Sequence, residues 1–234
     1  MIFAPPLIQG RLIRRYKRFL ADIEMADGSV ITAHTPNTGS MLGCSDPGSL
    51  VYLRDTKNPE RKYPLSWEMV ETLDGVLVGV HTGYANTLVA EAIENGVITS
   101  LQGYESLRRE VRFQRQGTRF DIFLSEGSQP DCFVEVKNVT AVEGELAIFP
   151  DAVTARGTKH LQKLTEVVQQ GMRGVMCFCV QREDVNEVAA AAHIDPLYAQ
   201  TLAEAAAQGV EIIAYQAKIS ASELTLIRQL PVRL

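Results

Sequence analysis

The sequence predicts a two-domain α/β protein: an N-terminal all-β barrel of the OB type, followed by a mixed β-sheet flanked by helices. Three observations predict this organisation. Short β-prone segments separated by turns fill the first eighty residues, the helical period first appears after residue 84, and helices then alternate with strands. We therefore expect a barrel over residues 1–83 and an α/β domain over residues 84–234.

Turn residues divide the first part of the chain into short strands. An Ala-Asp-Gly segment at 26–28 lies between two β-prone runs and indicates a hairpin. Pro-Gly, Asn-Pro and Asp-Gly pairs mark the later turns. The expected strands are residues 19–24, 30–34, 49–53, 62–70 and 76–80. Five or six strands at this spacing favour a small closed barrel, with Trp67 in its core.

After residue 84 the pattern predicts the order α-β-β-β-α-β-α-β. Apolar residues recur at helical spacing in three segments, and each of them ends at a glycine. Residues 175–180 form a continuous apolar run, which is typical of a strand buried on both faces. The expected helices are residues 86–95, 158–170 and 195–208, and the expected strands are 107–113, 120–124, 133–139, 175–180 and 210–215.

The composition is that of a folded protein without a membrane span. Hydrophobic residues make up 46% and charged residues 22% of the 234 positions, which is ordinary for a globular chain. The N-terminus lacks the basic start and apolar core of a signal peptide. The four cysteines lack metal-ligand spacing, so we expect reduced core thiols in a cytoplasmic protein. A net charge of -5 argues against DNA coating by bulk attraction.

Three charged residues interrupt two apolar strands. Asp121 lies in the first, and Glu135 and Lys137 lie in the second. Residues two apart in a strand share a face, so Glu135 and Lys137 should stand side by side. Two carboxylates on adjacent strands can hold Mg²⁺ or Mn²⁺ for phosphodiester cleavage, with the lysine orienting a water. The alternative is an internal ion pair between Lys137 and an acid.

Basic residues gather in two runs that could contact phosphates. Tyr16 and Phe19 are interleaved with the first run, as expected for a face that also stacks bases. The alternative for this run is a solvated edge strand protected by charge. The first run contains Arg11, Arg14, Arg15, Lys17 and Arg18, and the second contains Arg108, Arg109, Arg112, Arg115 and Arg119.

Two further segments are candidates for binding. Lys159 and His160 lie near the start of a predicted helix, where backbone N–H groups could meet a phosphate, although a solvated helix start is equally compatible. Asp151 is expected to be a turn or cap residue, with a site role open. The polar loop 34–41 is either a tight structured turn or a binding surface.

The element order and the charged positions resemble the PD-(D/E)XK nucleases. In that superfamily a helix precedes a three-stranded meander that carries an acid and then an acid-x-Lys motif. Asp121 matches the first acid, and Glu135-Val136-Lys137 matches the motif, although Phe120 replaces the proline that often precedes the first acid. The resemblance implies a restriction-endonuclease-like domain and gives Glu91, on the preceding helix, as an additional catalytic acid.

The whole chain resembles the sugar fermentation stimulation protein A family. The matching segments are residues 14–19, 33–41, 135–139, 149–153 and 157–160, which span both predicted domains. The resemblance implies an OB-like barrel joined to a nuclease-like domain, DNA binding, and a regulatory role in maltose metabolism. We therefore expect a DNA-binding protein, largely independent of sequence, with a divalent-metal site suited to phosphodiester hydrolysis. The alternative is a non-catalytic DNA-binding regulator.

Overall fold

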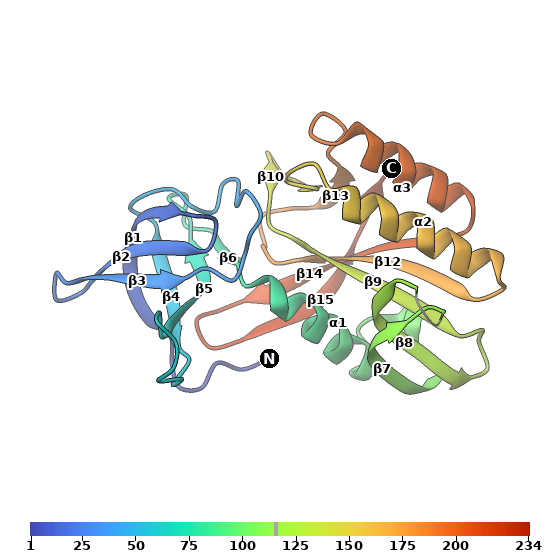
Figure 1. The fold of residues 1–234 in the computed structure, drawn as a ribbon, viewed down its shortest axis with the longest axis horizontal. Helices are drawn as coiled ribbons and strands as arrows, with labels where there is room; N and C mark the ends of the chain where they lie inside the picture. The colour runs from blue at the N-terminus through green and yellow to red at the C-terminus, as the bar shows by residue number, and fades with distance from the viewer. Residues whose placement is uncertain (115–116) are drawn as a thin grey trace.

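Six strands form the N-terminal sheet in the computed structural model, which describes residues 1–114 and 117–234 (Figure 1). Their order is β3-β2-β1-β4-β5-β6, and a parallel pairing of β3 with β5 closes five of them into a barrel. The strands are β1 (Ile8–Tyr16), β2 (Leu20–Met25), β3 (Val30–His34), β4 (Leu50–Asp55), β5 (Leu65–Glu71) and β6 (Leu77–Gly79). The predicted barrel is confirmed.

The barrel interior is apolar because alternate side chains of each strand point inward. Leu12, Ile23 and Leu53 are almost fully buried there. Trp67 is completely buried, as predicted, and its indole N–H donates to the Met69 carbonyl at 2.8 Å. This hydrogen bond satisfies the polar end of the indole inside the core.

The second domain is a mixed sheet with helices on both faces, as predicted (Figure 1). The main sheet has the order β15-β14-β12-β9-β8-β7, in which β9, β12 and β14 are parallel. The elements that form or cover it are α1 (Ala85–Glu94), β7 (Tyr104–Arg112), β8 (Arg119–Gly127), β9 (Cys132–Val139), α2 (Ala155–Gln169), β12 (Arg173–Val180), α3 (Pro196–Ala207), β14 (Glu211–Ile219) and β15 (Leu224–Leu230).

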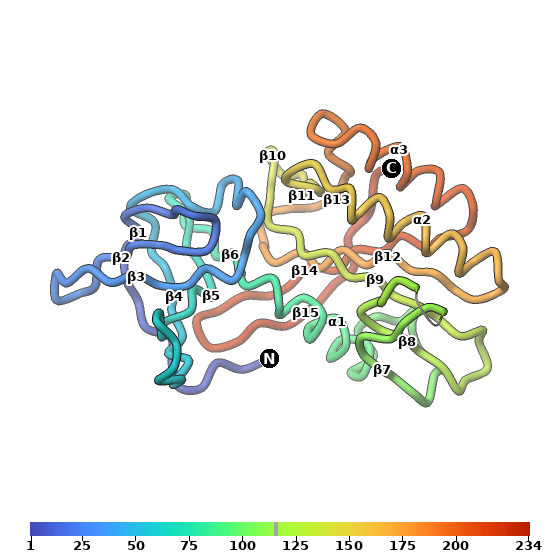
Figure 2. The backbone as a smooth tube through the Cα atoms, in the orientation of Figure 1, coloured from blue at the N-terminus to red at the C-terminus, as the bar shows by residue number. Residues whose placement is uncertain are grey.

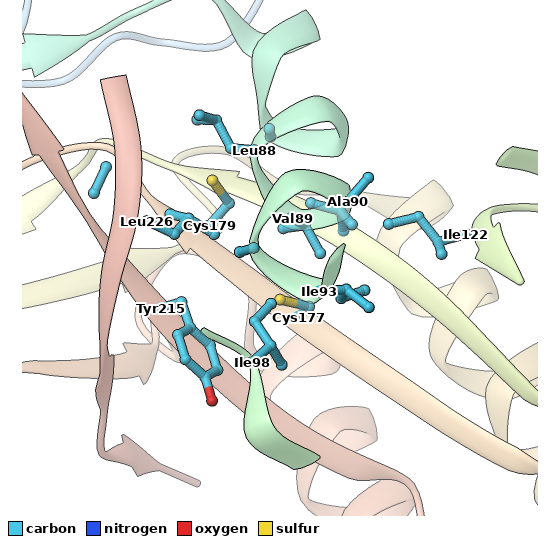
Figure 3. Close-up of a cluster of buried hydrophobic side chains, with 14 of the residues drawn as sticks. Leu88, Val89, Ala90, Ile93, Ile98, Ile122, Cys177, Cys179, Tyr215 and Leu226 are labelled. Carbon is cyan, nitrogen blue, oxygen red and sulfur yellow. The ribbon is translucent and has the colours of Figure 1, made fainter. Parts of the chain in front are cut away.

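Helix α1 covers one face of this sheet, and α2 and α3 cover the other. In Figure 3, the α1 side chains Leu88, Val89 and Ile93 pack in one cluster with Cys177 and Cys179 of β12. All four cysteines are buried and free, and burial raises the pKa of the Cys177 thiol to about 12. The α2 residues Leu161 and Leu164 belong to a second cluster with residues of α3 and the opposite sheet face.

Several short elements were not predicted. A second sheet has the order β10-β11-β13-β16, and two 3-10 turns flank α1. Strands of two to four residues carry too few side chains for a periodic pattern. These elements are η1 (Thr82–Tyr84), η2 (Thr99–Leu101), β10 (Val142–Glu143), β11 (Leu146–Phe149), β13 (Glu187–Ala190) and β16 (Val232–Arg233). The seven-residue β15 was also missed.

The two domains share a core and backbone hydrogen bonds. Tyr52 and Met69 of the barrel belong to the same buried cluster as α1. At the end of β6, the Gly79 N–H donates to the Gln181 carbonyl at 2.9 Å. An added Cβ at Gly79 would lie 2.3 Å from the Gln181 side-chain oxygen, so a larger residue would force the Gln181 side chain to move. The barrel is therefore packed directly on the second domain.

We expect both domains to unfold in one transition because they share this core. Trp67 is the single tryptophan and lies inside the barrel, whereas the α-helices that the structure describes all follow residue 84. A urea titration should give one midpoint from tryptophan fluorescence and from helical circular dichroism. A Trp67→Phe control should lose the fluorescence signal and keep a helical transition at lower urea. Two well-separated midpoints in the wild type would contradict a shared core.

Candidate active site

Strands β8 and β9 separate at the position of Asp121 and Glu135. The two strands pair only from Ile122↔Val134 to Leu124↔Cys132. Beyond that point the Val136 N–H donates to the Asp121 Oδ2 at 2.8 Å. A side-chain carboxylate thus satisfies a backbone donor where the strands diverge. The separation leaves room for charged side chains within the sheet.

The second oxygen of Asp121 faces the start of α1. Asn86 donates from its Nδ2 to Asp121 Oδ1 at 2.7 Å, so the carboxyl group is held from the helix and from β9. Burial, and then the negative charge of Glu135, raise the pKa of Asp121 to about 6. A second nearby carboxylate therefore makes ionisation of Asp121 less favourable, and a cation between the two would reverse this effect.

Glu135 is buried on the α2 side of the sheet, with only 3% of its surface exposed. Its Oε1 accepts from Lys137 Nζ at 2.5 Å and also contacts His160 Nδ1. Burial alone would raise the pKa of Glu135, but the His160 hydrogen bond and the Lys137 charge outweigh it, and the pKa is lowered. Oε2 is buried and has no hydrogen-bond partner among the described residues.

His160 orients Glu135 from α2. The Arg156 Nε–H donates to His160 Nε2 at 3.4 Å, so the ring proton lies on Nδ1, which faces the Glu135 carboxylate. The imidazole is 6% exposed. His160 is therefore a buried partner of the acid, and the prediction that it contacts phosphate at a helix start is wrong.

The helix boundary explains this error. Helix α2 begins at Ala155, where the Thr154 side chain accepts from the Gly157 N–H, and not at residue 158 as predicted. Lys159 and His160 consequently lie in the second turn, away from the free N–H groups of the first turn. Lys159 is exposed and lines a surface hollow with Gln114, Gly117 and Thr118.

Glu91 does not join this cluster, in contrast to the prediction. Its Oε2 accepts from the terminal amine of Met1 at 2.9 Å, where the N-terminal segment runs beside the β14–β15 hairpin (Figure 2). Glu91 lies five positions after Asn86 on α1, which turns it away by about 140° at 3.6 residues per turn. Among residues 1–114 and 117–234, no three or more His, Cys, Asp or Glu side chains are grouped to hold a metal.

A cleft of about 420 Å³ lies between the barrel and the second domain, beside the two carboxylates. Asn86 and Val136, which bond to Asp121, line it, and so does Lys137, which bonds to Glu135. The barrel contributes Asn37, Thr38 and Gly39. The predicted loop 34–41 therefore forms a wall of the cleft.

Arg15 and Asp151 hold that loop in place. Arg15 Nη2 donates to the carbonyls of Asn37 and Gly39, both at 2.9 Å. Asp151 Oδ2 accepts from the Ser40 N–H at 2.8 Å and from its hydroxyl at 2.9 Å. Both residues thus have structural partners, and the Asp151 contact joins the two domains.

The other residues of the first basic run have different surroundings. Strand β1 pairs with β4 only from Ile8 to Arg11, and its later part, which carries Arg14 and Arg15, pairs with β2. Arg14 is exposed but paired with Asp22 at 2.8 Å, and Arg11 donates to the Gly48 carbonyl at 3.0 Å. Lys17 and Arg18 lie in the turn after β1 and are exposed.

The second basic run follows β7 and the start of β8. Arg108 lies over the Phe123 ring at 4.9 Å, and Arg109 donates to Thr87 Oγ1 at 3.3 Å. Arg112 is exposed and pairs in register with Arg119, whose Nε lies 2.7 Å from Glu110. Arg115 lies outside the described residues. Of the described arginines in this run, Arg109 contacts α1, and none of them lines the cleft.

Sequence reasoning placed Asp121, Glu135 and Lys137 but missed Asn86, and it misread His160. An asparagine at the start of a helix carries no pattern that identifies its partner on a strand. The Glu135–His160 contact depends on how α2 packs across the sheet. Neither contact has a fixed sequence spacing.

The order of domains and the position of this site define a protein with an N-terminal OB domain and a restriction-endonuclease-like domain. Residues 13–80 match the family model described as "SfsA N-terminal OB domain", and residues 83–223 match "Sugar fermentation stimulation protein RE domain". The chain belongs to the sugar fermentation stimulation protein (SfsA) family, as the resemblance indicated.

Relatives match over essentially the whole chain. Sugar fermentation stimulation protein homologs are 50% identical over 234 residues in Shewanella loihica, covering 100% of both chains, and 54% identical over 227 residues in Geobacter metallireducens, covering 97% of both. The solved structure of Pyrococcus furiosus SfsA in complex with Ca²⁺ is similar with a TM-score of 0.87 and 26% identity, covering 100% of this chain and 98% of that one.

In the part of the chain that the structure describes, no helix combines the length and the apolar character needed to cross a bilayer.

At neutral pH, an Asp121→Asn variant should be at least as stable as the wild type. The folded pKa of about 6 lies above the ordinary 3.8, so stability is lost as pH rises from about 4 through 6, by on the order of 1–3 kcal/mol. The variant carries no charge to bury. Melting temperatures at several pH values should show the wild type losing stability relative to the variant towards neutral pH.

Glu105→Gln provides the control because Glu105 is an exposed carboxylate on β7. The difference in melting temperature between Glu105→Gln and the wild type should change little over the same pH range. If the difference in melting temperature between Asp121→Asn and the wild type did not depend on pH, this would contradict the raised pKa of Asp121.

Proposed function

We propose that this protein binds DNA and hydrolyses phosphodiester bonds with the help of Mg²⁺ or Mn²⁺ held by Asp121 and Glu135. The observation that carries the proposal is the pair of carboxylates, with Glu135 buried and Asp121 partly buried, beside Lys137 at the point where β8 and β9 separate next to the interdomain cleft. Carboxylate oxygens are the ligands that these cations prefer.

The residues fit a divalent cation. Glu135 Oε2 is buried without a partner among the described residues, and such an orphaned anionic oxygen is costly unless something binds it. The mutual repulsion that raises the pKa of Asp121 would also be relieved by a positive ion. Pyrococcus furiosus SfsA was solved with Ca²⁺, which also prefers oxygen ligands, and this further supports the proposal.

Each residue has a distinct role in the proposed reaction. A divalent cation in such a site lowers the pKa of a coordinated water and stabilises charge on a phosphate oxygen. Asn86 and the Val136 N–H fix the orientation of Asp121, and His160 fixes that of Glu135. Lys137 lines the cleft, where its ammonium group would orient the attacking water or neutralise the phosphate.

Exposed basic side chains would supply the contacts to the DNA backbone. Lys17 and Arg18 project from the turn after β1, and Arg108 and Arg112 lie on β7. Because such contacts are made to phosphates, binding would be largely independent of sequence. The chain has a net charge of -5, but positive charge can still be concentrated locally at these side chains.

A non-catalytic DNA-binding regulator is the second candidate, and one contact favours it. Lys137 Nζ and Glu135 Oε1 already form an ion pair at 2.5 Å, so Lys137 balances the charge of Glu135 without a metal. The family name points to sugar fermentation, and a regulatory link to maltose metabolism belongs to this second candidate. DNA binding without cleavage under any divalent-metal condition would favour it.

Metal-dependent cleavage should be lost when the cluster is changed. We expect Asp121→Asn and Lys137→Ala to reduce the rate by ~100-fold or more, the usual effect of removing a catalytic group, with DNA affinity changed only a few-fold. The assay is cleavage of end-labelled DNA with Mg²⁺ or Mn²⁺, compared with EDTA. Glu91→Gln should retain activity, because Glu91 bonds to Met1. An equally large loss of cleavage in Glu91→Gln would contradict the placing of the catalytic cluster at Asp121, Glu135 and Lys137.

Metal affinity should rise with pH, because a cation competes with the proton on Asp121. As the pH falls below the Asp121 pKa of about 6, the apparent Kd for Mn²⁺ should increase by up to ~10-fold for each pH unit. Above pH 7 the Kd should no longer change with pH. Isothermal titration calorimetry with Mn²⁺ would measure this dependence. Asp121→Asn should bind Mn²⁺ weakly at every pH. A flat profile in the wild type would argue against Asp121 as a ligand.

A further inference from the structure

We propose that the interdomain cleft selects an unpaired DNA strand over a duplex, and that the barrel loop 37–40 makes this selection. The inference rests on the proposed function, since it names the form of DNA that the site would accept. Three observations carry it: the size of the cleft, its lining, and the fixed position of the loop opposite Lys137.

The cleft has the size of a small-ligand site. Its volume of about 420 Å³ lies at the lower end of the roughly 300–1,000 Å³ of small-molecule pockets. One nucleotide unit fits such a space, whereas a duplex brings two strands and their stacked base pairs. With the barrel loop on one side and β9 on the other, access to Lys137 is restricted to a single strand.

The lining matches a nucleotide whose base is not paired. Six neutral amide and hydroxyl side chains line it beside apolar residues, and such groups can hydrogen-bond to the base edges that a duplex hides. Two cations, Lys137 and Arg156, lie among them and can meet a phosphate. The neutral polar residues are Asn37, Thr38, Thr82, Asn86, Asn138 and Thr140.

The loop is anchored rather than free to swing aside for a duplex. Arg15 holds two of its carbonyls from β1, and Asp151 holds Ser40 from the second domain. A Cβ added at Gly39 would lie 2.7 Å from Asp151 Oδ2, so the loop and the acid are in close contact. Arg15 and Asp151 thus act as positioning residues for the cleft wall.

An exposed aromatic residue lies in a turn that is hydrogen-bonded to this loop. Phe19 is 45% exposed in the turn after β1. Its carbonyl accepts from the Thr35 N–H at 2.8 Å, and Arg15 bonds to the neighbouring Arg18 carbonyl, so the turn is tied to the same loop. An exposed ring beside a single-strand path can stack on any base, because every base has a π-face.

The test is a comparison of single-stranded and hairpin-duplex oligonucleotides of one sequence, measured by fluorescence anisotropy in EDTA at fixed salt. The wild type should bind the single strand at least ~10-fold more tightly, and Phe19→Ala should remove ~10-fold of that affinity while leaving duplex binding unchanged. Because Phe19 is exposed, this variant should fold normally. Duplex binding as tight as single-strand binding would overturn the inference.

Asp151→Ala tests the loop. It should reduce the ratio of single-strand to duplex affinity, mainly by tightening duplex binding. Asp74→Ala is the matched control, since Asp74 is an exposed acid in the β5–β6 turn and its loss should affect both substrates equally. An unchanged ratio in Asp151→Ala would contradict the role of the loop.

Cleavage is assayed separately from binding. If the protein binds both oligonucleotides equally, strand selection fails but metal-dependent hydrolysis still stands. If it binds neither oligonucleotide, both the strand selection and the proposed function are overturned.

Discussion

The hydrogen bond from the Val136 N–H to Asp121 is the interaction on which the site depends. It satisfies a backbone donor at the point where β9 leaves β8, so the two strands can separate without an orphaned group. Glu135 and Lys137 occupy the gap thus formed. Asn86 reaches it from α1 and His160 reaches it from α2, so both helix layers hold the carboxylates. Pre-organisation by neighbouring elements is what a catalytic cluster needs.

The packing of the barrel on the second domain gives this cluster its surroundings. Shared core residues and the Gly79–Gln181 hydrogen bond fix the barrel beside β9. The loop held by Arg15 and Asp151 then closes one side of the cleft. A substitution at the domain junction would therefore alter the shape of the cleft as well as stability. The OB domain is in this sense part of the architecture of the candidate site.

Sequence patterns predicted the element order and the Glu135–Lys137 pair because both depend on local periodicity. Residues two apart on a strand share a face whatever the rest of the fold does. The partners of Glu91 and His160 were mispredicted because the phase of a helix against a sheet is set by tertiary packing. A three-residue error at the start of α2 was enough to move His160 from the first turn to the second. The carbonyl contacts of Arg15 likewise depend on a loop more than twenty positions away.

The central claim is that Asp121 and Glu135 together bind a divalent cation. Anomalous diffraction from a crystal soaked in Mn²⁺ tests it most directly, because the ion itself is located. The account predicts an anomalous peak about 2.0–2.3 Å from a carboxylate oxygen of each residue, and no such peak in an Asp121→Asn crystal. A clear Mn²⁺ peak elsewhere, with none between Asp121 and Glu135, would contradict it.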